Sequence, residues 1–235
     1  MKFLKSIVKK ILPETFIRWL ERLLGRTRYP PSGTYSTITL TDEEIEKGSY
    51  KQFLGGGSES WESRGAFQLF FLRKMGMLEN SRVLDVGCGP GRAGKHLIEF
   101  LEPNNYYGVD YNADFIKAAQ RMSEKNNLDA KNPVFEVVQD FRLDHIDRAF
   151  DFAIVFSVLN HCDVEQRSAF FKMIPKPLRK GGKVYITHAN WFDDSYIENS
   201  NMERTNQFDA NDFDVTEFGW DAKDDISPII ELTKS

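Results

Sequence analysis

The sequence predicts an α/β fold, in which a seven-stranded and mostly parallel sheet carries helices on both faces. From residue 82 onward, short apolar runs alternate with helical segments, which is the pattern of βαβ units. A glycine-rich turn directly follows the first apolar run. The last two runs look like paired strands at a sheet edge. With 41% hydrophobic and 28% charged residues, the 235-residue chain has the composition of a globular protein with one substantial core.

The expected elements follow from periodicity and capping residues. A helix over 59–75 ends at Gly76, a good C-cap. Asn112 caps a helix that runs to about residue 126, and Asp163 with Gln166 forms a capping box after the fourth strand. The seven predicted strands cover residues 82–86, 106–110, 134–138, 150–156, 183–187, 214–220 and 229–234.

Three regions are predicted along the chain: a basic amphipathic helical arm over 1–28, a linker over 29–54 and the α/β domain over 55–235. The arm holds eight Lys and Arg residues against two Glu, a charge of +6, whereas the remainder carries −10. Its apolar residues recur at helical spacing with lysines between them. Such an arm either lies on an anionic membrane surface or packs on the domain. Pro30, Pro31 and Gly33 indicate the linker.

Charge and cysteine content limit which partners and which cellular compartment fit the sequence. The negative body argues against nucleic acid as a partner, because phosphate neutralisation needs a basic face. The two cysteines, Cys88 and Cys162, fit a reducing compartment. Lysines interrupt the first apolar run, so it lacks the apolar centre of a secretory signal, and no stretch reaches the ~20 apolar residues of a membrane span. We expect a cytoplasmic protein whose arm can contact the inner face of the membrane.

The strongest chemical signal is the strand and turn over residues 83–91, VLDVGCGPG. Its glycines, Gly87, Gly89 and Gly91, allow a sharp turn and let a ligand lie against bare backbone. Together with Gly94, the last two also satisfy the G-x-G-x-x-G pattern of dinucleotide sites, so NAD is the competing ligand.

Three acidic positions bear on the choice between S-adenosylmethionine and NAD, and two of them favour S-adenosylmethionine. Asp85 precedes the first glycine, where a carboxylate would repel a pyrophosphate and attract the ammonium and sulfonium groups of S-adenosylmethionine. Asp110 ends the second strand and can accept both ribose hydroxyls, which suits either ligand. Asp140, between Gln139 and Phe141, offers an acceptor for the adenine amino group beside an aromatic ring.

Residues 55–234 resemble the class I S-adenosylmethionine-dependent methyltransferases. The matching segments are VLDVGCGPG at 83–91, YYGVDYN at 106–112, VVQDF at 137–141, FDFAIVFSVLNH at 150–161 and LRKGGKVYIT at 178–187. The resemblance implies a Rossmann-like sheet with the cofactor across the carboxyl ends of its strands. It also implies a role for each matched residue: Asp85, Gly87 and Gly89 line the methionine part, Asp110 holds the ribose, Asp140 and Phe141 hold the adenine, and Ser157 lies near the sulfonium.

Four further residues complete the expected cofactor site: Arg64, Cys88, Gly91 and Tyr111. Arginines at the position of Arg64 pair with the methionine carboxylate in similar proteins, although a solvated helix arginine is an equally good interpretation. Cys88 contributes its backbone rather than its thiol. We expect no metal ligand.

Two histidines are candidate catalytic bases. His161 follows the fourth strand and His188 ends the fifth, where the acceptor should lie. His161 is the first choice, and a structural role in packing under the cofactor is its alternative. A base is needed only when the acceptor must lose a proton. The sequence lacks the Asn-Pro-Pro-Tyr motif of DNA and glutamine N-methyltransferases.

The acceptor is expected to be a small molecule or a glycan, methylated on oxygen. Residues 190–212 form a polar and aromatic connection that would help cover an open acceptor pocket. The arm loosely resembles the leading helices of methyltransferases of bacterial surface-polysaccharide assembly. Two other functions stay open: an NAD-dependent oxidoreductase or other Rossmann-type nucleotide binder, and a non-catalytic S-adenosylmethionine-binding protein.

Overall fold

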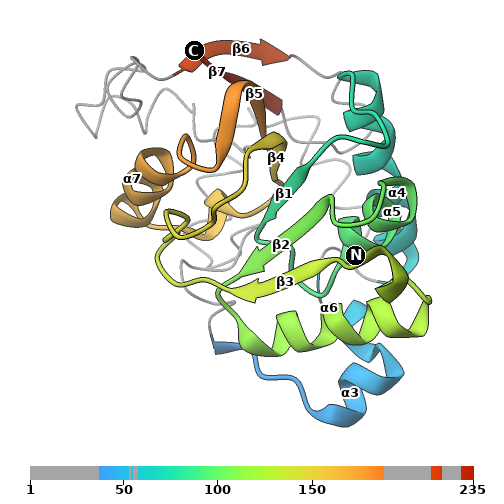
Figure 1. Cartoon of the computed structure of the whole chain (residues 1–235). Helices are drawn as coiled ribbons and strands as arrows, with labels where there is room; N and C mark the ends of the chain where they lie inside the picture. The colour runs from blue at the N-terminus through green and yellow to red at the C-terminus, as the bar shows by residue number, and fades with distance from the viewer. Residues whose placement is uncertain (1–36, 53, 55–57, 188–212, 219–228) are drawn as a thin grey trace, which may run out of the picture.

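The computed structural model describes residues 37–52, 54, 58–187, 213–218 and 229–235. Its centre is a seven-stranded sheet of order β3-β2-β1-β4-β5-β7-β6 (Figure 1). The strands are β1 Val83–Val86, β2 Tyr106–Asp110, β3 Val134–Val137, β4 Phe150–Val155, β5 Leu178–Thr187, β6 Phe213–Phe218 and β7 Ile229–Lys234. Strands β1 to β5 pair in parallel, and β7 pairs antiparallel with both β5 and β6. The predicted fold class is confirmed.

Helices cover both faces of this sheet. The helices are α3 Asp42–Lys47, α4 Ser58–Lys74, α5 Arg92–Phe100, α6 Ala113–Lys125 and α7 Val164–Met173, with 3₁₀ turns η2 Ser49–Gln52, η3 Asp129–Lys131 and η4 Leu159–His161. The predicted caps are confirmed at Asn112 and at Asp163, where the capping box with Gln166 is complete. After α4, Gly76 adopts φ 95° and its N–H donates to Arg73 O at 3.2 Å, as in a helix-terminating glycine turn.

Two apolar cores lie on the two sides of the sheet. On one side, residues of α4, α5 and α6 pack against Val83 of β1 and Ile154 of β4. On the other side, Phe170 of α7 belongs to a cluster with Leu84 and Val155. These two residues directly follow Val83 and Ile154 in their strands. Successive residues of a strand face opposite sides, so strands buried on both faces are apolar at every position. This explains why the central strands could be recognised as continuous apolar runs.

The second half of the predicted linker is a packed part of the domain, and this corrects the expected boundary at residue 54. Thr41 forms a complete capping box with Glu44 at the start of α3. Leu40, Ile45, Tyr50 and Leu54 are buried with Trp61 of α4 and with Phe115 and Ala118 of α6. Residues 29–36 and the arm over 1–28 lie outside the described residues.

Two connections differ from the expected alternation. Residues 138–149 lead from β3 to β4 without a helix. Strand β5 begins at Leu178 rather than at residue 183, because Leu178 pairs with Phe150 and the register then shifts until Lys183 pairs with Phe152. Gly181, at φ 71°, lies in this irregular stretch. In the described part of the chain, no helix is long and apolar enough to cross a membrane.

Candidate functional site

The glycine turn after β1 is packed at Gly87 and Gly91 and open at Gly89. Gly87, Gly89 and Gly91 all have positive φ, at 74°, 54° and 81°. A Cβ on Gly87 would lie 2.3 Å from Val158 Cγ2 and would clash, whereas one on Gly91 would lie 2.4 Å from Met122 Cε and would displace the end of that flexible side chain. At Gly89 nothing lies within 4 Å. The turn therefore presents bare backbone to open space at Gly89, where a ligand can approach closely.

Asp110, at the carboxyl end of β2, binds the open part of this turn. Its Oδ2 accepts the N–H of Gly89 at 2.9 Å, and its Oδ1 accepts the N–H of Asn112 at 2.9 Å. Burial raises the pKa of Asp110 to about 6, although these backbone N–H groups lower it. A carboxylate oxygen that accepts one hydrogen bond can still accept another. Asp110 can thus hold the turn and receive ligand hydroxyls together.

Asp85 is the second carboxyl group beside the turn, and it is only 4% exposed. Its Oδ2 accepts a hydrogen bond from Tyr106 OH at 2.9 Å. Burial raises the pKa of Asp85 to about 7; the Tyr106 bond lowers this pKa, the charge of Asp110 raises it, and Arg92 lowers it. A buried carboxylate without an ion partner is unfavourable, so a cationic ligand at the turn would stabilise its ionised form.

The expected adenine and sulfonium residues have unusual backbone conformations. Asp140, Phe141 and Ser157 adopt φ 52°, 53° and 62°, a region that non-glycine residues rarely occupy. The Phe141 ring packs edge-on against Phe170, with 5.3 Å between the ring centroids. The N–H of Ser157 donates to Thr187 Oγ1 at 2.8 Å and so joins the carboxyl ends of β4 and β5.

Tyr111 and Cys88 have different surroundings. Tyr111 is 37% exposed, and its carbonyl accepts a hydrogen bond from Gln139 Nε2 at 3.0 Å, which links the turns after β2 and β3. Cys88 is buried, and burial raises the pKa of its thiol well above the usual value. Its backbone N–H donates to Val109 O at 3.0 Å. Cys88 therefore contributes its backbone and a buried side chain to the turn.

The structure describes one of the two candidate bases, His161. His161 is partly buried at the end of η4, and its backbone N–H donates to Val158 O at 2.9 Å. Since the Val158 side chain also contacts Gly87, His161 belongs to the turn that packs directly on the glycine turn. His188 lies outside the described residues, as does the connection over 190–212.

Arg64 is exposed on α4. The next residue, Gly65, allows α4 to approach α5 so closely that a Cβ there would lie 2.4 Å from Arg92 O. Arg92 begins α5 directly after the glycine turn, and its guanidinium carbon lies 5.8 Å from the Trp61 ring centroid. Its charge also acts on Asp85. Sequence reasoning missed Arg92, although its place directly after the third glycine was a usable signal.

These features fit S-adenosylmethionine better than NAD. Two buried carboxyl groups, Asp85 and Asp110, flank one glycine turn whose open face is at Gly89. A pyrophosphate on this turn would meet both carboxylates, whereas an ammonium and a sulfonium would be attracted to them. The site contains acceptors suited to ribose hydroxyls at Asp110, so the residues present are compatible with S-adenosylmethionine.

Comparisons with known proteins point the same way. Residues 78–232 match a family described as a methyltransferase domain. The chain is 28% identical over 189 residues to sterol 24-C-methyltransferase erg6 of Aspergillus fumigatus, covering 74% of this chain and 48% of that protein. It is 31% identical over 112 residues to the fatty-acid O-methyltransferase of Mycolicibacterium smegmatis, covering 48% of this chain and 38% of the relative.

Among solved structures, magnesium protoporphyrin IX methyltransferase from Synechocystis PCC 6803 with bound S-adenosylmethionine has a similar fold. The TM-score is 0.58 at 17% identity, over 85% of this chain and 100% of that one. The chain spans less than half the length of the curated relatives it matches. None of these three methyltransferases is named for a surface polysaccharide, so that narrower resemblance is not supported.

Proposed function

The chain belongs to the family of class I S-adenosylmethionine-dependent methyltransferase domains, and from this we propose that the protein methylates an oxygen atom of a small-molecule or glycan acceptor. The observation that carries the proposal is the pair of buried carboxyl groups, Asp85 and Asp110, beside a glycine turn that is open at Gly89. This arrangement favours a cationic cofactor with a ribose over a dinucleotide.

The proposed contacts follow the geometry of the carboxyl edge of the sheet. Asp85 and the backbone of Gly87 and Gly89 would hold the methionine part, and Asp110 would hold the ribose. Asp140 and Phe141 would hold the adenine. Arg92 joins Arg64 as a candidate partner for the methionine carboxylate, because it lies at the amino end of α5 and beside the turn. Ser157 would lie near the sulfonium.

When bound, S-adenosylmethionine supplies a methyl group already activated by positive sulfur. The chain's own residues then have to hold the acceptor in line with that methyl group. A hydroxyl acceptor must also lose its proton, and His161 is the proposed base because it follows β4 and packs through Val158 on the glycine turn. The name of the fatty-acid O-methyltransferase supports an oxygen acceptor, whereas the sterol relative is named for carbon.

Cofactor binding is the first experiment. We expect the protein to bind S-adenosylhomocysteine in calorimetry with a Kd in the micromolar range, about −8 kcal/mol. Asp110→Ala should weaken binding by ~1–3 kcal/mol, because it leaves ligand hydroxyls and backbone N–H groups without an acceptor. Asp144→Ala, which changes an exposed carboxylate in the loop before β4, is the matched control and should bind as the parent does.

The outcome separates the alternatives. Binding of NADH with no response to S-adenosylhomocysteine would contradict the proposal and favour an oxidoreductase. Transfer of labelled methyl from S-adenosylmethionine to metabolites in a cell extract would identify the acceptor class. Cofactor binding without transfer to any extract or glycan fraction would instead indicate a non-catalytic binding protein.

A further inference from the structure

We propose that residues 37–41, which we call the strap, border the cofactor site, and that Asn112 is the positioning residue that holds the strap beside Asp110. The inference rests on the role of Asp110 proposed above. In Figure 1 the strap is the blue segment that starts near the carboxyl ends of β2 and β3 and leads to α3. None of its residues belongs to the motifs that predict the cofactor site.

Asn112 makes contacts in three directions and is only 7% exposed. Its backbone N–H donates to Asp110 Oδ1 at 2.9 Å. Its Oδ1 accepts the N–H groups of Asp114 and Phe115, at 2.9 and 3.3 Å, and so caps α6. Its Nδ2 donates to Ile38 O at 2.9 Å. Capping needs only an acceptor, which Ser, Thr or Asp would supply, whereas the bond to Ile38 is made by the amide N–H at the end of the Asn side chain.

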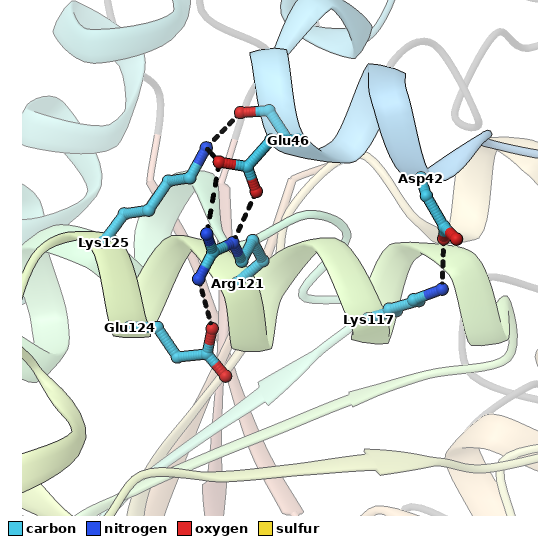
Figure 2. A network of polar contacts seen from close by, with 6 residues as sticks. All are labelled: Asp42, Glu46, Lys117, Arg121, Glu124 and Lys125. Atoms are coloured by element: carbon cyan, nitrogen blue, oxygen red, sulfur yellow. Dashed lines mark hydrogen bonds and ion pairs between the residues drawn. The ribbon is translucent and has the colours of Figure 1, made fainter.

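The strap has a second attachment to the same end of α6. The N–H of Leu40 donates to Asp114 Oδ2 at 2.9 Å, and the Leu40 side chain is buried with Trp61 and Phe115. Beyond the strap, α3 lies along α6 and is joined to it by ion pairs (Figure 2). Asp42 pairs with Lys117, and Glu46 pairs with Arg121 at 2.7 Å and with Lys125 at 2.9 Å.

The bond from Asn112 to Ile38 connects the strap to a residue that also binds the proposed ribose carboxylate. Asn112 binds Asp110 through its backbone and the strap through its side chain, so it links the position of the strap to that of Asp110. A single residue, Asn112, therefore bridges the strap main chain at Ile38 and Asp110. This bridge lies on the edge where adenosine would bind between Asp110 and Asp140. A cofactor seated there should restrict the strap, and a fixed strap should favour the bound cofactor by the same factor.

The test compares two N-cap substitutions. Asn112→Ser keeps a capping oxygen and a neutral side chain, but its shorter side chain lacks the amide N–H that reaches Ile38 O. Asp163→Ser puts the same residue at the N-cap of α7, away from the strap, and is the control. We expect Asn112→Ser to raise the Kd for S-adenosylhomocysteine about tenfold, the factor that corresponds to ~1.4 kcal/mol. The KM for S-adenosylmethionine should rise with it while kcat is unchanged, and Asp163→Ser should keep the parent Kd.

Hydrogen exchange supplies a readout that a purely structural role would not change. In the parent, S-adenosylhomocysteine should slow amide exchange over residues 37–41, and Asn112→Ser should lose this slowing at saturating ligand. Asp114→Ala removes the acceptor of the Leu40 N–H and leaves Asn112 in place, so it should act in the same direction if Asn112→Ser fails to fold.

The failures are distinguishable. If the parent does not bind S-adenosylhomocysteine, the proposed function and this inference are both wrong. If Asp110→Ala weakens binding but Asn112→Ser and Asp114→Ala do not, only the strap inference is wrong. Exchange over 37–41 that does not respond to the ligand in the parent would also overturn it.

Discussion

Three residues of the candidate site, all at the same edge of the sheet, have an unfavourable backbone conformation. Asp140, Phe141 and Ser157 have left-handed φ values of 52°, 53° and 62°. Such a conformation costs a non-glycine residue on the order of 1–3 kcal/mol and is concentrated at functional sites. Glycine would remove the penalty at each position. Strain at three positions of one sheet edge supports the proposal that these residues contact adenine and sulfonium.

The buried carboxyl group of Asp85 makes stability depend on pH. Its folded pKa is about 7, above the ~3.9 of an unfolded aspartate, so the folded state binds more protons between these values and stability falls as pH rises through that window. Asp85→Asn removes the buried charge. It should be more stable than the parent at pH 8, by on the order of 2 kcal/mol, with a difference that shrinks toward pH 4.

Urea denaturation at pH 5 and pH 8 measures this difference. Asp144→Asn, at an exposed position, is the control and should show the same small effect at both values. A stability change for Asp85→Asn that is equal at pH 5 and pH 8 would mean that the carboxyl group is already ionised at low pH. Binding of S-adenosylhomocysteine should weaken in the same variant, because its ammonium group loses a carboxylate partner.

His161 is testable as the base that receives the acceptor's proton. His161→Gln should lower turnover at least ~100-fold and leave the Kd for S-adenosylhomocysteine nearly unchanged, the pattern of an interaction made in the transition state. In the parent, kcat should fall toward acidic pH, because a protonated imidazole cannot accept the acceptor's proton.

The variant's failure modes are informative. Near-parent turnover in His161→Gln would transfer the role to His188 or make an already ionised acceptor, such as a carboxylate, the better choice. Loss of both turnover and cofactor binding would show that His161 is a packing residue of the turn at Val158, which contacts Gly87.

At the scale of elements, the sequence predicted the strands that a local apolar run defines. Strands β1 to β4 lie within one residue of their expected bounds because each is an apolar run ended by a turn. Helix α3 was missed because it has six residues, and its buried neighbours, Leu40, Ile45, Tyr50 and Leu54, are unevenly spaced. The start of β5 was missed because Arg179 to Gly182 are polar or glycine and enter the strand through an irregular register.

Helix α3 and η2 should be held on α6 by buried apolar contacts rather than by the ion pairs of Figure 2. Tyr50 is 3% exposed and packs edge-on against Trp61, with 5.8 Å between the ring centroids. Tyr50→Ala should cost roughly 3 kcal/mol of unfolding free energy, as for other large buried side chains. Arg121→Ala should leave Tm almost unchanged, because exposed ion pairs are weak and screened by salt.

Thermal and urea denaturation at low and high salt check both expectations. A large loss of stability in Arg121→Ala that disappears in high salt would show that the ion pairs, and not the cluster around Tyr50, fix α3. Tyr50→Phe, which keeps the ring and removes only the hydroxyl, is the matched control for Tyr50→Ala.

At the scale of the molecule, the basic arm over 1–28 should be separable from cofactor binding. The described domain packs from Leu40 onward, and every proposed cofactor residue lies beyond it. Deleting residues 1–26 should leave the Kd for S-adenosylhomocysteine within about twofold and reduce sedimentation with vesicles that contain anionic lipid, where each basic residue contributes ~1 kcal/mol. Neutral vesicles are the control. A truncated protein that aggregates would mean that the arm packs on the domain, and the membrane proposal would then be wrong.

The sequence predicted which candidate residues share the carboxyl edge of the sheet, and it missed the contacts between segments that are distant in the chain. Asp85 is the next-to-last residue of β1, Asp110 ends β2, and Asp140 and Ser157 follow β3 and β4, so a parallel sheet brings them to one edge. Asn112 was recognised only as a helix cap. Its bond to Ile38, 74 positions away in the chain, depends on the docking of α3, which no local pattern indicates.

The position of β7 between β5 and β6 constrains the order in which the sheet is completed during synthesis. Strand β6 is synthesised before β7, yet β7 is its neighbour in the sheet, so β6 has no strand to join until β7 has emerged. At ordinary rates of translation this takes about one to three seconds. Until then the β5 edge is open and Tyr185 and Lys183 lack Glu231, which accepts from them at 2.5 and 3.0 Å in the folded protein. A chain whose strands β1 to β5 paired before β7 emerged would offer the unpaired edge of β5 to neighbouring polypeptides.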